Sequence, residues 1–145
     1  MSSYRTSSVI DSTILYDVVL LLTRITISCM LMTHGLMKLT ALLGDEPVKF
    51  ADPIGVGAVP SLILAIFAEV VCPFLIILGV ATRFATIPVI VTMLVAVFNI
   101  HSADTFDVKE LPMLYFVSFM IFFATGAGKF SVDYLIKSRK RSVNY

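Results

Sequence analysis

Residues 60–80 read PSLILAIFAEVVCPFLIILGV, and this stretch decides the fold. As a helix it is long enough to cross the hydrocarbon core of a bilayer, which requires about 20 residues at a rise of about 1.5 Å each. Its only charged residue is Glu69, so the helix has no polar face that could meet water. The stretch therefore predicts a membrane-spanning helix that carries one carboxylate near mid-depth.

Three further apolar stretches, residues 18–42, 84–100 and 111–127, reach or approach the same length. Apolar residues make up 58% of the 145-residue chain and charged residues only 14%, whereas about a quarter of the residues of a soluble protein are charged. A soluble protein with four buried core helices is disfavoured, because no stretch has a long polar face. We therefore predict an all-α fold, an integral membrane four-helix bundle.

Prolines and glycines support these helix limits. Pro60 and Pro112 fall in first turns, where a missing amide donor does no harm, and Gly79 lies near a last turn. Pro73 and Pro88 lie inside spans, where a proline removes a hydrogen bond of the helix. We expect a kink at each of these two positions.

Basic residues gather at one end of the predicted bundle. With four crossings, both termini and the short loop after residue 80 lie on one side of the membrane. The basic residues of that side are Arg5, Arg83, Lys129, Lys137, Arg139, Lys140 and Arg141. The loops of the other side hold the basic residues Lys38, Lys49 and Lys109 and the acidic residues Asp45, Glu46, Asp52, Asp104, Asp107 and Glu110. Because cytoplasmic segments carry the excess of Lys and Arg, we predict that the N and C termini are both cytoplasmic.

This orientation divides the chain into a cytoplasmic N-terminal segment, 1–17, a four-span membrane domain, 18–128, and a basic cytoplasmic tail, 129–145. In the tail, Phe130 and Tyr134 precede a run of basic residues, a pattern typical of a helix that lies on anionic lipid. A plain basic tail that only sets the topology explains the pattern equally well.

Arg24 and Glu69 lie inside predicted spans, and His34 and Lys38 lie farther along the first span. A charge within a span costs at least about 2.5 kcal/mol, so each charged group needs a partner. At a rise of about 1.5 Å per residue, His34 lies about 12 Å and Glu69 about 13.5 Å below the outer ends of their helices. Arg24 lies nearer the cytoplasmic end, but its side chain is long. We predict an internal network of Arg24, His34 and Glu69 that Lys38 closes on the outer side.

This network has two interpretations. Positions 24, 28, 31, 35 and 38 share one face of the first helix, which should point inward and could serve a ligand or a moving proton. Alternatively, the charges only set the register of the helices by pairing with one another, since buried ionic groups can serve specificity alone. The sequence leaves both interpretations open.

Residues 101–110, HSADTFDVKE, space His101, Asp104, Asp107 and Glu110 three apart at the outer edge. Such donors could bind a divalent cation, but the spacing is nonspecific and a solvated acidic loop is the favoured interpretation. A haem between His34 and His101 is disfavoured because the two lie at different depths. We predict no metal site and no cofactor held by the chain itself.

Motifs that would name a reaction are absent from the sequence, which has no phosphate-binding loop, no nucleophile arrangement and no nucleic-acid surface. Cys29 and Cys72 stand singly in apolar stretches, so we predict two small buried apolar residues rather than a disulfide or a redox pair. The expected partners are the lipid bilayer and other membrane proteins, without nucleic acid.

Several short motifs follow one another in a fixed order. In the first span these are Arg24 and the run THGLMK, with His34, Gly35 and Lys38. Next come Glu69 and the run LIILGVATR, with Gly79, Thr82 and Arg83. The last are His101, Glu110 and the run GAGKFSVD, with Gly126, Gly128, Ser131 and Asp133. Over residues 18–133 this order resembles the DoxX family of small four-helix bacterial membrane proteins.

The resemblance implies a multi-pass protein of the bacterial inner membrane that is linked with redox systems. Members of the family are subunits of quinol oxidases or of thiosulfate:quinone oxidoreductases, or belong to oxidative-stress complexes. Because the sequence has no motif for a redox cofactor, the resemblance implies at most an enzyme subunit, one that anchors partners or shapes a quinone site.

Three hypotheses follow. The first is an accessory or anchoring subunit of a quinone-linked redox assembly, in which His34, Lys38 and Glu69 line an outward-facing polar pocket that binds a quinone carbonyl or a small anion. His101 and Glu110 are secondary candidates on the outer side. The second is a carrier of a small solute or proton. The third is a purely structural subunit of a larger membrane complex.

Overall fold

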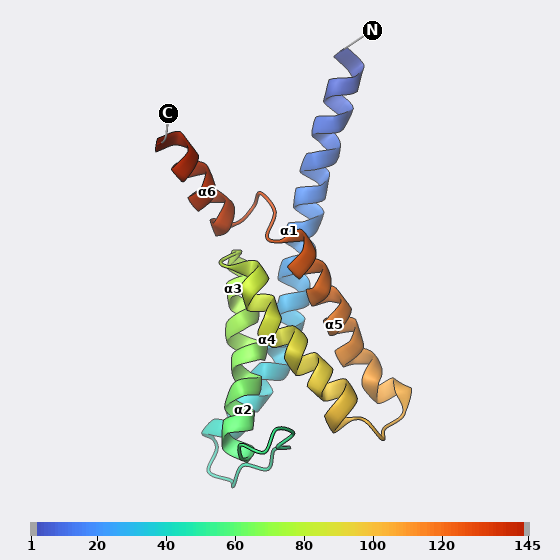
Figure 1. Ribbon diagram of the computed structural model, residues 1–145, viewed down its shortest axis with the longest axis vertical. Helices are drawn as coiled ribbons and strands as arrows, with labels where there is room; N and C mark the ends of the chain where they lie inside the picture. The colour runs from blue at the N-terminus through green and yellow to red at the C-terminus, as the bar shows by residue number, and fades with distance from the viewer. Residues whose placement is uncertain (1–2, 144–145) are drawn as a thin grey trace.

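The computed structural model describes the backbone of residues 3–143 and the side chains of residues 13–139. Within these residues every regular element is a helix, which confirms the all-α class (Figure 1). In chain order the elements are α1 (Ser3–Leu43), α2 (Ala58–Ile66), the π-helix η1 (Phe67–Val71), α3 (Cys72–Leu78), α4 (Thr82–Val95), the π-helix η2 (Ala96–Ile100), α5 (Phe106–Thr125) and α6 (Val132–Val143).

Four stretches are long and apolar enough to cross a membrane, as predicted. They are Thr13–Leu43 in α1, Ala58–Leu78 in α2, η1 and α3, Thr82–Ile100 in α4 and η2, and Phe106–Thr125 in α5. The fourth begins five residues before the predicted limit of 111, because its first five residues include the charged residues Asp107, Lys109 and Glu110. A count of apolar residues misses a polar turn that begins a helix.

Each span packs against the next along the chain, and α5 returns to contact α1. The first turns of α1 and the whole of α6 lie at one end of the molecule, hereafter the terminal end, and residues 44–57 lie at the opposite end, the loop end (Figure 1). The first turns of α1 and the last helix, α6, are therefore on one side, as four crossings require. That this side is cytoplasmic stays a prediction, and the side chains of Arg5, Lys140 and Arg141 lie outside the described residues.

A core of apolar side chains fills the middle of the bundle. Leu31, Ile76, Val89 and Phe119, one from each span, are almost completely buried. Cys72 joins this core, but the prediction for Cys29 is wrong, because Cys29 lies on the exposed side of α1. The next residue along a helix points about 100° away from its neighbour, so Cys29 does not share the buried face of Ser28.

The second span changes its helix type around Glu69. Proline has no amide hydrogen to donate, and just before Pro73 the backbone forms η1, in which the Cys72 N–H donates to the Phe67 carbonyl five residues earlier. Pro88, by contrast, lies within the continuous helix α4. A π-turn inserts one extra residue and so changes the direction of the side chains around it, and such turns are frequent at functional sites.

Candidate functional site

The first and second spans approach most closely at Gly35. A β-carbon at this position would lie 2.6 Å from Val70 Cγ2 and 2.9 Å from the carbonyl carbon of Glu69, so no side chain fits there. Lys38 lies about one turn farther along α1, on the same face. The missing side chain of Gly35 therefore lets the two backbones meet and places Lys38 beside Glu69.

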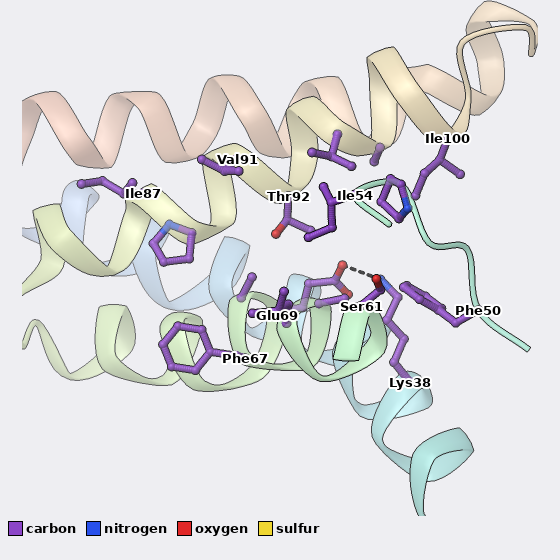
Figure 2. A pocket seen from close by; sticks show the side chains of 17 residues that line it. Lys38, Phe50, Ile54, Ser61, Phe67, Glu69, Ile87, Val91, Thr92 and Ile100 are labelled. Atoms are coloured by element: carbon purple, nitrogen blue, oxygen red, sulfur yellow. Dashed lines mark hydrogen bonds and ion pairs between the residues drawn. The ribbon is translucent and has the colours of Figure 1, made fainter. Parts of the chain in front are cut away.

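Lys38 and Glu69 form an ion pair between Nζ and Oε1 (Figure 2). The Glu69 side chain is only 4% exposed, whereas the Lys38 side chain is 30% exposed. The second carboxylate oxygen, Oε2, is buried and has no hydrogen-bond partner among the described residues. A buried acceptor without a donor is unfavourable, so Oε2 marks a position where a bound molecule would gain by donating a hydrogen bond.

Glu69 lines a cavity of about 410 Å³, hereafter the membrane cavity. The polar groups in its wall are the ion pair and the hydroxyl groups of Ser61 and Thr92. The other lining residues are apolar: Phe50, Pro53, Ile54, Leu64, Ala65, Phe67, Ala68, Ile87, Pro88, Val91, Val95, Ala96 and Ile100. Phe67 and Ile87 are partly exposed on the surface of the spans. The cavity therefore opens toward lipid between the second and third spans. The ion pair is the charged part of its wall and lies between Phe67 and Phe50 (Figure 2).

A second cavity, of about 590 Å³, lies at the loop end and is called the loop cavity. Its lining is more polar and includes His34, Lys38, Glu46 and Lys49. Lys38 and Phe50 line both cavities, and Lys38 Nζ lies 5.9 Å from the centre of the Phe50 ring, within the range of a cation–π contact. Lys38 thus stands between a lipid-facing and a loop-facing space.

Residues 50–54 form a cover at the loop end of the membrane cavity. The Asp52 carboxylate accepts hydrogen bonds from Gly57 N–H at 2.7 Å, from the Ser61 hydroxyl at 2.8 Å and from Val56 N–H at 3.0 Å. These donors hold the pKa of Asp52 below its ordinary value. Asn99 donates from Nδ2 to the Pro53 carbonyl at 3.2 Å. Two adjacent residues of the cover are therefore attached to helices, Asp52 to α2 and Pro53 to η2.

Arg24 does not join this site, so the predicted network of Arg24, His34 and Glu69 is wrong in its Arg24 contact. The Arg24 guanidinium is buried and donates to the carbonyl of Ala127, to that of Phe130 at 2.8 Å and to that of Ile77 at 3.3 Å. Carbonyls near the ends of helices carry partial negative charge and lack helical donors, so they suit a cation.

The arginine belongs to a set of contacts that joins the segments of the terminal end. The Asp133 carboxylate accepts from Ala81 N–H at 2.9 Å and from Thr82 N–H at 3.2 Å, at the start of α4. The Asp133 N–H donates to the Gly79 carbonyl at 2.9 Å. Gly79 has φ +70°, and a β-carbon there would lie 2.5 Å from Ser131 Cβ. These motif residues therefore hold helix ends together rather than lining either cavity.

The remaining candidate residues, His34, His101 and Glu110, take no part in the Lys38–Glu69 ion pair. His34 faces the loop cavity, and its ring packs edge-on against Tyr115 with centroids 6.0 Å apart. His101 Nδ1 lies 2.7 Å from Asp104 Oδ2 at the loop end, and Glu110 is exposed. Neither His101 nor Glu110 lines either cavity. In the described part of the chain, no three metal-binding side chains come together.

Sequence reasoning missed the cover. Asp52, Ser61 and Asn99 are ordinary polar residues near predicted helix ends. An aspartate ahead of a glycine-rich turn is a recognisable turn signal, and Asp52 precedes Gly55 and Gly57. The contact of Asn99 with the Pro53 carbonyl has no counterpart in the sequence pattern, because it joins two segments that are far apart in the chain.

Fold and site together define a four-span membrane protein with a lysine–glutamate pair at the polar end of a lipid-facing cavity. The sequence pattern of the DoxX family matches residues 19–102, which include Gly35, Lys38 and Glu69. The chain belongs to the DoxX family.

Two curated proteins of Haemophilus influenzae, each described as an uncharacterized protein, are similar to the chain. One is 38% identical over 78 residues, which cover 51% of this chain and 52% of that protein. The other is 32% identical over 117 residues, which cover 76% of this chain and 84% of that protein. The chain thus spans about half the length of the first relative and most of the second. No solved structure matches the chain.

Proposed function

We propose that this DoxX-family protein is an accessory subunit of a quinone-linked redox assembly in a bacterial inner membrane, and that its membrane cavity holds the head of a quinone. The observation that carries the proposal is the buried, unpartnered Oε2 of Glu69 in the wall of an apolar cavity that opens toward lipid. The loop end would face the periplasm, by the excess of basic residues at the other end.

The chemistry of the pair suits the two forms of such a ligand. A quinone presents carbonyl oxygens, and Lys38 carries three donor hydrogens, of which the contact with Glu69 Oε1 uses only part. A quinol presents hydroxyl groups, and Glu69 Oε2 is free to accept from one of them. The apolar ring and tail would lie between Phe67 and Ile87, where the cavity opens toward lipid.

The size of the cavity also fits. Ligand sites for small molecules usually have volumes of about 300–1,000 Å³, apolar walls and a few placed polar groups. The membrane cavity, at about 410 Å³ with one ion pair, has these properties. A molecule with a long tail would place only its head inside and leave the tail among acyl chains.

Binding tests the proposal directly. The full chain in lipid nanodiscs is titrated with a short-tailed benzoquinone and its quinol by calorimetry. Glu69→Gln and Lys38→Met should each weaken binding by about tenfold or more, the loss expected when a charged hydrogen-bond partner is removed. Glu110→Gln and Lys109→Met make the same chemical changes at residues outside both cavities and should leave the affinity unchanged. Equal affinities in all four variants, or no binding to the unaltered chain, would overturn the proposal.

A carrier of protons or small solutes is the second candidate, and the position of Lys38 between the two cavities favours it. A carrier needs an ionisable group that can be reached from two sides in turn. Flux into proteoliposomes that is present in the unaltered chain and lost in Glu69→Gln would support this function. Tight quinone binding without any flux supports the first.

A further inference from the structure

The two cavities share one movable wall. Lys38 lines both of them, and its side chain is held by the ion pair with Glu69 on one side and lies near the Phe50 ring on the other. Lysine has a flexible stem of four carbons, so its ammonium group can turn toward either space. Moving this side chain would therefore open the part of the shared wall that Phe50 does not form.

The surroundings of Glu69 differ between the two ends of the bundle. Toward the loop end lie groups that can titrate or carry charge, namely His34 and Lys38 from α1 and Glu46 and Lys49 from residues 44–57. Tyr115 of α5 packs edge-on against the His34 ring. Toward the terminal end the bundle is filled by Leu31, Cys72, Ile76 and Phe119, all almost completely buried. Water therefore has a polar approach to Glu69 from the loop end and an apolar barrier from the terminal end.

We propose that the loop cavity is the water-side entrance to the membrane cavity, and that the Lys38 side chain closes it while paired with Glu69. This proposal rests on the proposed function and gives the one ligand site two entrances. An amphiphile enters through lipid between the second and third spans, and water reaches its polar head from the loop cavity. The ligand class is then one whose head exchanges a proton with water while its tail stays in the bilayer.

Thiol labelling measures how readily a water-soluble reagent passes Lys38 from the loop cavity into the membrane cavity. In the full chain with Cys29→Ser and Cys72→Ala, a probe cysteine is introduced as Ala68→Cys, in the wall of the membrane cavity next to Glu69. The chain in nanodiscs reacts with a charged methanethiosulfonate, which does not enter lipid, and intact mass follows the modification. Lys38→Ala should speed labelling of this probe by about tenfold or more, since it removes the side chain that separates the two spaces. Lys38→Met, which keeps the length but cannot pair, should also speed it, by a smaller factor.

Two further probe positions separate an opened entrance from a loosened bundle. Met37→Cys lines the loop cavity and should be labelled at the same rate whether residue 38 is Lys, Ala or Met. Val89→Cys is buried in the core and should stay unlabelled throughout. Equal rates at Ala68→Cys with and without Lys38, or labelling of Val89→Cys in step with it, would overturn the proposal. No quinone is present in this experiment, so its outcome is independent of whether quinone binds.

Discussion

Gly35 of α1 lies against the backbone of Glu69 so closely that a β-carbon at residue 35 would stand 2.9 Å from the Glu69 carbonyl carbon. This contact is what brings a lysine and a glutamate from two helices to one level of the membrane. The site therefore depends on a residue without a side chain as much as on the two charged ones.

Gly35→Ala should lower the stability of the bundle. The added methyl group forces the first and second spans apart, and overpacking of this kind usually costs about 1–3 kcal/mol. Thermal unfolding in detergent, followed by circular dichroism, measures the effect. Gly44→Ala is the matched control, because its β-carbon would meet Thr40 O only at 3.5 Å. If Gly35→Ala and the unaltered chain have the same melting curve, the two spans can accommodate the methyl group and the prediction is wrong.

Arg24→Lys should destabilise the fold but spare the ligand site. The guanidinium donates to three carbonyls, and one ammonium group cannot reproduce their geometry. We expect a loss of about 2–3 kcal/mol, the scale of charged hydrogen bonds that are broken. Chemical unfolding gives this number, and quinone affinity of the folded fraction should be unchanged. If affinity falls as far as in Glu69→Gln while stability is unaltered, Arg24 belongs to the ligand site after all.

The cover over the membrane cavity should respond to acid through Asp52. Hydrogen bonds to Gly57 N–H and to the Ser61 hydroxyl favour the carboxylate and lower its pKa from the ordinary 3.8. Their contribution to stability is therefore complete above pH 3.8 and is lost as the pH falls through the lower pKa of the folded protein. The Gly57 amide resonance in NMR spectra should titrate with this group. A midpoint at or above 3.8, or an unchanged titration in Asp52→Asn, contradicts the assignment.

Asn99→Ala should loosen the same cover without affecting the ion pair. It removes the hydrogen bond to the Pro53 carbonyl, so residues 50–54 lose their attachment to the third span. We expect faster dissociation of bound quinone by a few-fold, the effect of about 1 kcal/mol. Stopped-flow exchange against unlabelled quinone measures it. Ser118→Ala removes a hydroxyl that donates to the Leu114 carbonyl within α5, and it should leave the rate unchanged.

The sequence predicted four spans, Glu69 level with His34, and Lys38 on the outer side of both, because length, hydropathy and helical rise determine these features. Glu69 and Lys38 are recognisable as charges that need partners in lipid, and Gly35 lies between Lys38 and His34 on the same helix. These parts of the account rest on properties of single helices, which a sequence displays directly.

The partners of Arg24 could not be read in the same way. They are backbone carbonyls of Ile77, Ala127 and Phe130, which every residue carries, and only the folded chain brings them to one place. A search among side chains pointed instead to Glu69, the one acidic group within reach by depth. The cover could not be predicted for a similar reason. Its contact with Asn99 joins two segments that are far apart in the sequence.

The central claim, that the polar end of a membrane-soluble ligand lies against Lys38 and Glu69, is tested most directly by photocrosslinking. A benzoquinone with a photoreactive group on its short tail is bound to the full chain in nanodiscs, illuminated and mapped by mass spectrometry. The account predicts adducts on Phe67, Ile87 and Val91, and their loss in Glu69→Gln but not in Glu110→Gln. Adducts spread evenly over the lipid-facing side chains of α5, unaffected by either substitution, would contradict it.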